Sequence, residues 1–336
     1  MSIPVIALTG PLGAGKTTVL NHLLATPGAR IGVVINDFGA INVDAGLVVG
    51  QVDEAAGIAG GCVCCLPDGG GLDDALEKLT DPRLRLDAVI VEASGVAEPA
   101  ALAKLIRFSG AEHARLGGVI DVLDAVEHES AIEAGLVAPA RYRSATLAVV
   151  NKIDRVPDER RAARERELAE AVHAHNPDVQ VVAAARGAID PRLVFDAAGE
   201  EDPADQLPLS ALLREEHAAE HHHAHARSVG RAVRGPVDAE ALIDLLERPP
   251  AGAYRMKGTV PVRTSRGERR YTVHRVGGSL HVERAPRGRA ADGLVAIGMQ
   301  LDESEARERI DRALAPADGA ACGGLGRLER YERLSR

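Results

Sequence analysis

A glycine-rich turn between an apolar run and a helical pattern constrains this chain most. The segment Gly10-Pro11-Leu12-Gly13-Ala14-Gly15-Lys16-Thr17-Thr18 follows Val5-Ile6-Ala7-Leu8 and fits the pattern G-x-x-x-x-G-K-[ST]. In such a turn, consecutive backbone N–H groups and the positive end of the following helix point at phosphate oxygens. The pattern therefore predicts a phosphate loop that binds a nucleoside triphosphate. A chance glycine turn is the alternative, and the upstream strand argues against it.

Within this loop, two side chains have predicted roles. Lys16 is expected to reach the β- and γ-phosphates, and Thr17 to ligate Mg²⁺. The predicted phosphate-binding set is Gly10, Gly13, Ala14, Gly15, Lys16, Thr17 and Thr18.

A second motif predicts the base. Asn151-Lys152-Ile153-Asp154 follows the apolar run 146–150, which places it at the carboxyl end of a parallel sheet, where nucleotides bind. Asp154 would accept from guanine N1–H and the N2 amine, whereas adenine would leave the carboxylate partly unpaired. Asn151 would read the opposite base edge, and the Lys152 stem would lie along the base and sugar. The two motifs together favour GTP over ATP.

The spacing of apolar runs predicts an α/β protein, a P-loop NTPase with a mostly parallel sheet flanked by helices. Continuous rather than alternating apolar runs are typical of strands buried on both faces. The expected strands are 4–9, 31–36, 87–92, 117–124, 146–151 and 179–184, and the expected helices are 16–26, 72–80, 98–109, 127–138 and 158–175.

A change of composition near residue 200 predicts a second domain. We expect a GTPase domain over 1–199, a polar His-rich linker over 200–227 and a small α+β domain over 228–336. In the last, strands are expected near 228 and at 254–261, 269–276, 280–284 and 294–299, with helices at 238–248 and 304–314.

Composition excludes several classes of function. The net charge of −9 and the scarcity of aromatic residues, with 4 Tyr, 3 Phe and no Trp, argue against nucleic-acid binding. Neither a signal-like segment nor an apolar run of membrane-spanning length is present in the sequence. We therefore expect a cytoplasmic protein with no nucleic-acid or membrane partner.

Three of the 4 cysteines form a Cys62-Val63-Cys64-Cys65 motif after two glycines. Thiols stay reduced in the cytosol, so a disulfide framework is not expected. Cys62, Cys64 and Cys65 are candidate ligands for a soft metal such as Zn²⁺, with a redox pair or inert burial as alternatives. Cys322 is expected to be a surface thiol.

The predicted linker carries a histidine cluster. His217, His221, His222, His223 and His225 include pairs at i, i+4, which share one helical face and can bind a metal together. A solvated polar linker is the other interpretation, so the cluster is an auxiliary candidate.

These motifs, in this order, resemble one family. A phosphate loop, a C-x-C-C element, Glu92-Ala93-Ser94-Gly95-Val96-Ala97-Glu98-Pro99, N-K-x-D, a His-rich linker and Tyr254-Arg255-Met256-Lys257-Gly258 look like the CobW-like metallochaperone GTPases. The resemblance covers nearly the whole chain. It implies a GTPase, slow without a partner, that inserts or delivers a metal, most often Zn²⁺. It leaves open cobalt handling for cobalamin synthesis and nitrile hydratase activation.

The resemblance also assigns residues. Cys62, Cys64 and Cys65 match the family's metal motif, and Glu92 and Gly95 match its E-x-S-G switch. The stretch after the second predicted strand keeps a carboxylate at Asp37. Ile35 and Ala40 lack the oxygens that some members use beside the cysteines, which favours a thiolate-rich site. Asp37 and Glu92 are candidates for contacting water on Mg²⁺ or orienting the attacking water, and no arginine finger is identifiable.

The implied partners are GTP, a divalent metal and a client metalloprotein that docks on the GTPase or C-terminal domain, with a homodimer left open. From Arg255 to Asp292 the chain carries ten basic and three acidic residues. This basic stretch is either a docking face or solvated hairpin charge. A metal buffer or sensor without turnover is the alternative from another class, and a P-loop ATPase or kinase is a third.

Overall fold

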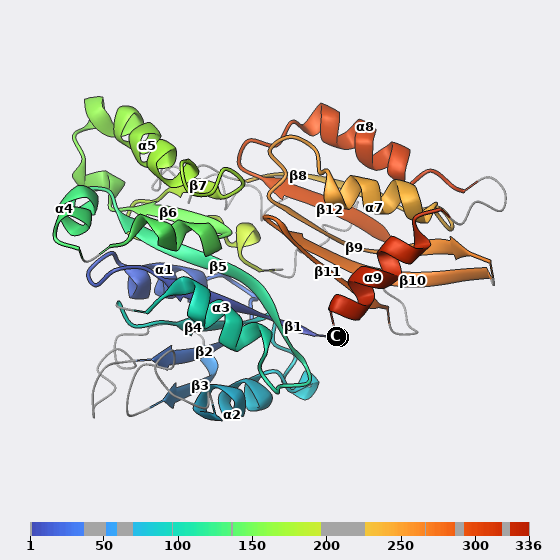
Figure 1. Ribbon diagram of the computed structural model, residues 1–336, viewed down its shortest axis with the longest axis horizontal. Coiled ribbons are helices and arrows are strands. Elements are labelled where there is room, and N and C mark those ends of the chain that lie inside the picture. Colours follow the sequence, from blue (N-terminus) through green and yellow to red (C-terminus); the bar gives the residue numbers. More distant parts are fainter. Residues whose placement is uncertain are drawn as a thin grey trace. The chain divides into compact units, whose positions relative to one another are not determined.

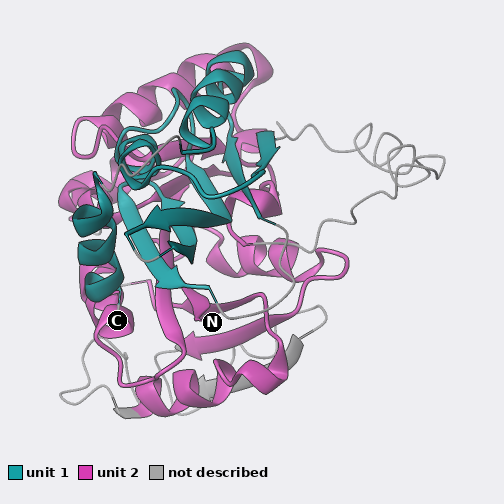
Figure 2. Ribbon diagram, turned by 90° about the vertical axis from the view of Figure 1, so that its right-hand side faces the viewer, with its two compact units in different colours: residues 1, 225–336 teal, residues 2–224 magenta. Residues whose placement is uncertain are grey.

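The computed structural model describes residues 2–36, 52–58, 70–95, 97–135, 137–195, 226–265, 267–285, 292–317 and 323–335. The chain forms two compact units, residues 2–224 and residues 225–336, which Figure 2 shows in separate colours.

The first unit is built on a seven-stranded sheet with the strand order β3-β2-β4-β1-β5-β6-β7 (Figure 1). Every neighbouring pair in this described sheet is parallel. The strands are β1 (Ile3–Thr9), β2 (Ile31–Asn36), β3 (Val52–Ile58), β4 (Ala88–Glu92), β5 (Ala114–Asp124), β6 (Leu147–Asn151) and β7 (Gln180–Ala183). The predicted α/β class and parallel sheet are confirmed.

Helices connect these strands because parallel neighbours need crossover connections. They are α1 (Lys16–Leu24), α2 (Gly70–Leu79), α3 (Pro99–Arg107), α4 (His128–Glu133) and α5 (Asp158–His173), with short 3₁₀ turns η3 (Pro82–Leu84), η4 (Pro139–Ser144), η5 (Ile153–Arg155) and η6 (Pro191–Leu193). Val5 and Ala7 of β1 share one apolar cluster with residues of α2 and α3. Ile6 and Leu8 point to the opposite face and are equally buried. Both faces of β1 are therefore covered, as its continuous apolar run predicts.

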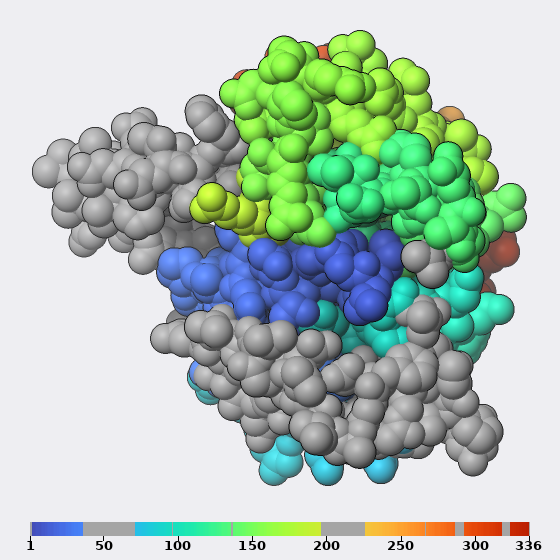
Figure 3. Space-filling view, turned by 90° about the vertical axis from the view of Figure 1, so that its left-hand side faces the viewer, coloured from blue at the N-terminus to red at the C-terminus, as the bar shows by residue number. Residues whose placement is uncertain are grey.

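Because the strands are parallel, their carboxyl ends lie at one edge of the sheet. The phosphate loop follows β1, Glu92 ends β4 and Asn151 ends β6. Blue residues of the N-terminal segment are exposed on the face shown in Figure 3, next to green residues of the later strands and helices. This edge gathers the chemistry-bearing residues of the first unit, in agreement with the rule for open α/β sheets.

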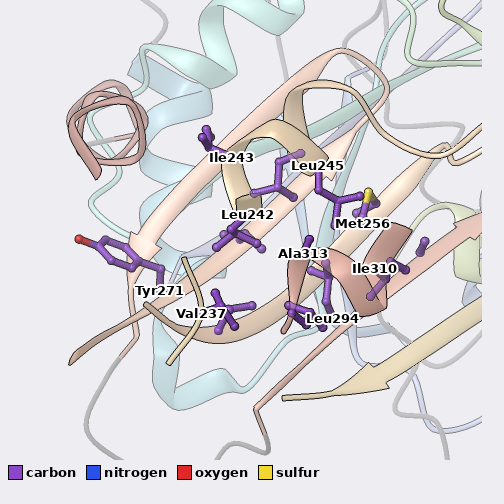
Figure 4. Packing of buried hydrophobic residues seen from close by; sticks show 14 of the residues in the cluster. Val237, Leu242, Ile243, Leu245, Met256, Tyr271, Leu294, Ile310 and Ala313 are labelled. Carbon is purple, nitrogen blue, oxygen red and sulfur yellow. The ribbon is translucent and has the colours of Figure 1, made fainter. Parts of the chain in front are cut away.

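The second unit is an antiparallel sheet with the order β11-β10-β9-β12-β8. Its strands are β8 (Arg227–Ala232), β9 (Arg255–Thr264), β10 (Gly267–Val276), β11 (Ser279–Arg284) and β12 (Gly293–Gly298), and its helices are α7 (Ala239–Glu247), α8 (Glu303–Ala313) and α9 (Leu325–Leu334). One sheet face packs on these helices through a core that includes Leu242, Met256, Leu294 and Ile310 (Figure 4). The expected small α+β unit is confirmed.

Three elements differ from the predictions. β3 was not expected, because its sequence VDEAAGI carries two acids and lacks a strong apolar run. The helix expected over 127–138 ends at Glu133, since Gly135 adopts a left-handed conformation (φ 70°) that ends helices. Helix α9 was not expected because glycines and alanines precede it.

The basic stretch of the second unit is partly neutralised by ion pairs. Arg269 Nη1 lies 3.0 Å from Glu329 Oε1, and Arg284 Nε lies 2.9 Å from Glu332 Oε1. Both carboxylates belong to α9, outside the stretch in which the charges were counted. Arg270 pairs with Asp292. The local excess of charge is therefore smaller than the sequence count indicates, which weakens the docking interpretation.

Among the described residues, no helix combines the length and apolar character needed to cross a membrane.

Candidate functional site

The phosphate loop has a backbone that only glycine adopts readily at key positions. Gly15 caps α1 with φ 97°, and a Cβ there would lie 2.3 Å from Asn151 Nδ2. Gly10 has φ 145°, and its Cβ would lie 2.5 Å from the carbonyl oxygen of Val122. The glycines thus allow both the turn and its close approach to β5 and β6.

Lys16 and Thr17 begin α1 and face the loop and the end of β4. The Lys16 ammonium donates to the carbonyl oxygens of Gly10 at 3.1 Å and Pro11 at 3.3 Å. The Thr17 hydroxyl donates to Glu92 Oε1 at 2.8 Å, and Glu92 is 3 % exposed. The structure therefore joins the phosphate loop to the end of β4 through the two residues predicted to act near Mg²⁺. Hydroxyl and carboxylate oxygens are the ligands that this hard cation prefers.

Asn151 is buried beneath the loop, with both ends of its amide engaged. Its Nδ2 donates to the carbonyl oxygen of Ala14 at 2.9 Å, and its Oδ1 accepts from the Gly187 N–H at 2.8 Å. This differs from the expectation that Asn151 reads a base edge. In this geometry it connects the phosphate loop to the segment after β7.

Lys152 and Asp154 occupy the turn after β6. Lys152 has a left-handed backbone (φ 61°), and its ammonium forms an ion pair with Asp124 Oδ2 at 2.5 Å. Burial alone would raise the pKa of Asp124, but hydrogen bonds from Lys152 and from the N–H groups of Val126 and Glu127 outweigh it and lower the pKa. Asp154 lies in η5 and is exposed, so its carboxylate is accessible to a base.

Two glycines fix the neighbouring loops. Gly95 packs on the phosphate loop so closely that a Cβ would lie 2.6 Å from the Leu12 nitrogen. Gly187, which sequence reasoning missed, has φ 76°, and its Cβ would lie 2.7 Å from the carbonyl carbon of Thr18. A substitution at either glycine would push on the phosphate loop or on α1.

A buried ion pair next to the loop was also missed. Arg141 of η4 contacts Asp121 of β5 through two bonds of 2.8 Å, and the Thr9 hydroxyl donates to the same carboxylate at 2.8 Å. Both partners are buried, and Coulombic attraction from Asp121 overcomes the effect of burial and raises the pKa of Arg141. Thr9 is the residue before Gly10, so the pair supports the start of the loop. The available signal was a charge inside the apolar run 117–124.

The candidate transition-metal ligands lie outside the described residues. These are Cys62, Cys64, Cys65, His217, His221, His222, His223 and His225, together with Asp37. In the part of the chain that is described, no group of three or more His, Cys, Asp or Glu side chains could hold a metal ion. The cysteine segment follows β3 and precedes α2, so it begins at the same sheet edge as the phosphate loop.

Comparison with known protein families decides the family. Residues 4–183 match the CobW/HypB/UreG nucleotide-binding domain. This chain belongs to that family. Residues 226–314 match the cobalamin synthesis protein CobW C-terminal domain. The resemblance inferred from the ordered motifs is confirmed.

Several curated relatives of this CobW-family chain carry names related to zinc. It is 31% identical over 206 residues to the zinc chaperone YjiA of Escherichia coli, covering 59% of this chain and 62% of that protein. It is 34% identical over 147 residues to the zinc chaperone CobW of a Sinorhizobium species, covering 40% of this chain and 39% of that protein. A zinc-regulated GTPase metalloprotein activator of Dictyostelium discoideum is 33% identical over 122 residues, covering 32% of this chain and 25% of that protein. The chain thus matches less than two thirds of each of these relatives.

Solved structures include similar folds. The Zn(II)-bound YjiA GTPase from E. coli is 21% identical with a TM-score of 0.43, covering 93% of this chain and 99% of that one. HypB from Helicobacter pylori in complex with nickel is 20% identical with a TM-score of 0.43, covering 66% and 89%. The assignment to the CobW family rests on the sequence match.

Proposed function

We propose that this protein is a GTP-hydrolysing metallochaperone that binds Zn²⁺ through Cys62, Cys64 and Cys65 and delivers it to a client metalloprotein. The observation that carries the proposal is the 2.8 Å hydrogen bond between Thr17 and Glu92. This bond joins the loop that would hold the phosphates to the segment that would respond to hydrolysis. The names of the curated relatives supply the support for zinc as the cargo.

In this proposal the nucleotide lies on the carboxyl edge of the seven-stranded sheet. Lys16 exchanges its bonds to Gly10 and Pro11 for the β- and γ-phosphates, and Asp154 accepts from guanine. Thr17 would hold Mg²⁺, which when bound neutralises charge that develops on the phosphates. Asp37 or Glu92 orients the attacking water.

Hydrolysis without a partner would be slow. An arginine that stabilises the transition state is worth several orders of magnitude in rate. Arg141 lies beside the loop, but the bidentate pair with buried Asp121 holds it. A client or a second copy of the chain would therefore supply the acceleration.

Release of zinc would be coupled to the nucleotide. Loops that contact the γ-phosphate are ordered in the triphosphate state and relax after hydrolysis. The cysteine segment follows β3, and β3 pairs with β2, which in turn pairs with β4 and its terminal Glu92. The proposal is that GTP favours the arrangement in which three thiolates hold the metal.

Zinc binding by the Cys62–Cys65 segment is tested on the full chain. We expect one tightly bound Zn²⁺ per chain, and an intense sulfur-to-metal charge-transfer band after substitution with Co²⁺. Affinity should fall as the pH is lowered, because the thiols must lose protons to bind a metal.

Cys64→Ser should weaken zinc and remove most of the band. Cys322→Ser, which changes a cysteine outside the motif, should leave both unchanged. Equal zinc affinity and an equal band in the two variants would place the site elsewhere and refute the proposed ligand set. Zinc-stimulated GTP turnover in the unaltered protein then separates a chaperone GTPase from a metal buffer.

A further inference from the structure

A cavity of about 360 Å³ lies beside the phosphate loop in the first unit. Leu12 of the loop and Gly95 line it on one side, and His128 and Ala131 of α4 together with Arg141 and Tyr142 of η4 line it on the other. The volume is in the range of small-molecule sites. Only Gly13 and Lys152 belong both to this cavity and to the predicted nucleotide-binding set.

The charged groups in the wall neutralise one another. Arg141 forms two bonds to Asp121, and Lys152 forms an ion pair with Asp124. The remaining wall includes the apolar side chains of Leu12, Leu123, Ala131 and Val137. An ion entering this cavity would have to compete with pairs that are already formed, so an uncharged, mostly apolar ligand fits the wall best.

His128 supplies one unmatched polar atom. The residue is 4 % exposed, and within the described structure its Nε2 has no hydrogen-bond partner. Its Nδ1 lies 3.5 Å from the Tyr142 hydroxyl. Burial lowers the pKa of His128 and raises the pKa of Tyr142, so the imidazole is neutral and the phenol is protonated. When the phenol donates to Nδ1, the imidazole proton is on Nε2 and needs an acceptor.

We propose that this cavity is a binding site for a small uncharged molecule with an apolar ring and a carbonyl or similar acceptor, which receives a hydrogen bond from His128 Nε2. The ring would contact Leu12 and Ala131. Because Gly95 packs directly on Leu12, an occupant would also bias the loop that faces the γ-phosphate. This second consequence rests on the proposed nucleotide site, whereas binding itself does not.

Ligand-observed saturation-transfer NMR tests the site with benzamide, which has a ring and an uncharged acceptor. Toluene lacks the acceptor and benzoate is an anion, so both should bind more weakly than benzamide. The expected difference between benzamide and toluene is roughly three- to tenfold, equivalent to one hydrogen bond. Benzamide should still bind when the protein is saturated with GDP.

Three variants locate the probe. Ala131→Phe should fill the cavity and abolish binding, whereas Ala134→Phe, at an exposed position one turn later, should leave it unchanged. His128→Phe keeps a ring of similar size and should make benzamide and toluene bind equally. Far-ultraviolet circular dichroism and thermal unfolding establish that each variant is folded, and His128→Phe decides the test if Ala131→Phe does not fold.

Several results would overturn the site. One is no benzamide binding to the unaltered protein, and another is equal binding in folded Ala131→Phe. A benzamide preference that survives in His128→Phe would exclude the proposed hydrogen bond. Displacement by GDP would show that the probe lies in the nucleotide site instead. Failure of the chain to bind GTP at all would overturn the proposed function and leave this test intact.

Discussion

Asn151 and Asp154 are three residues apart in one motif but have different surroundings. Asn151 is 1 % exposed and bonds to backbone atoms of two loops, whereas Asp154 is exposed. Asn151→Ala should leave the Ala14 carbonyl and the Gly187 N–H without their partner, which costs about 1–3 kcal/mol for each buried group. GTP and GDP affinities, measured by calorimetry, should fall together. Asn176→Ala, which also removes two bonds to backbone but far along the chain, is the matched control and should lower thermal stability alone.

Asp154→Asn should instead change the choice of base. An amide donates where the carboxylate accepted, so the variant should lose affinity for GTP and gain affinity for xanthosine triphosphate. In the unaltered protein, GTP should bind at least tenfold more tightly than ATP, a difference of about 1.4 kcal/mol. Asp178→Asn, another exposed aspartate of the same unit, should have no effect on either nucleotide. Equal affinities for GTP and ATP in the unaltered protein would rule out guanine specificity.

Helix α9 is the element whose contribution the sequence conceals. Leu328 is fully buried in the core of the second unit, and Leu334 of the same helix is 71 % exposed. Leu328→Ala should destabilise this unit by about 2–5 kcal/mol, because it removes buried surface and leaves a cavity. Leu334→Ala should change stability by less than about 0.5 kcal/mol. Chemical denaturation followed by circular dichroism measures both, and equal effects would mean that α9 does not pack as described.

Elements with strong patterns were predictable, and those with weak patterns were not. The continuous apolar runs of β1, β4 and β6 and the glycine loop determined the sheet and the phosphate loop, because burial on both faces leaves a clear pattern. β3 was missed since it contains Asp53 and Glu54. At the site, Lys16, Thr17 and Glu92 were identified from motifs. Asp121 and Arg141 were not, because a pairing across 20 residues depends on tertiary structure that local patterns do not carry.

At the scale of the whole molecule, the proposed mechanism requires coupling between two ligands. If GTP increases the affinity for zinc, zinc must increase the affinity for GTP by the same factor. A coupling of about 1–3 kcal/mol, or roughly 5- to 150-fold, is typical. Zinc dissociation constants measured against a competing chelator should be lowest with a non-hydrolysable GTP analogue and higher with GDP. Three indistinguishable constants for the apo, GDP and analogue states would refute the coupled mechanism, even if each ligand binds well.

The position of β3 has a consequence for how such proteins can diversify. In the described sheet β3 is the outermost strand and pairs with β2 alone. The chain on either side of it, from Asp37 to Cys65, can therefore change in length and composition while only one strand pairing is disturbed. The phosphate loop follows β1, which has strands on both sides and cannot vary so freely. Metal preference could thus be exchanged between relatives as a cassette, while the nucleotide-binding machinery stays constant.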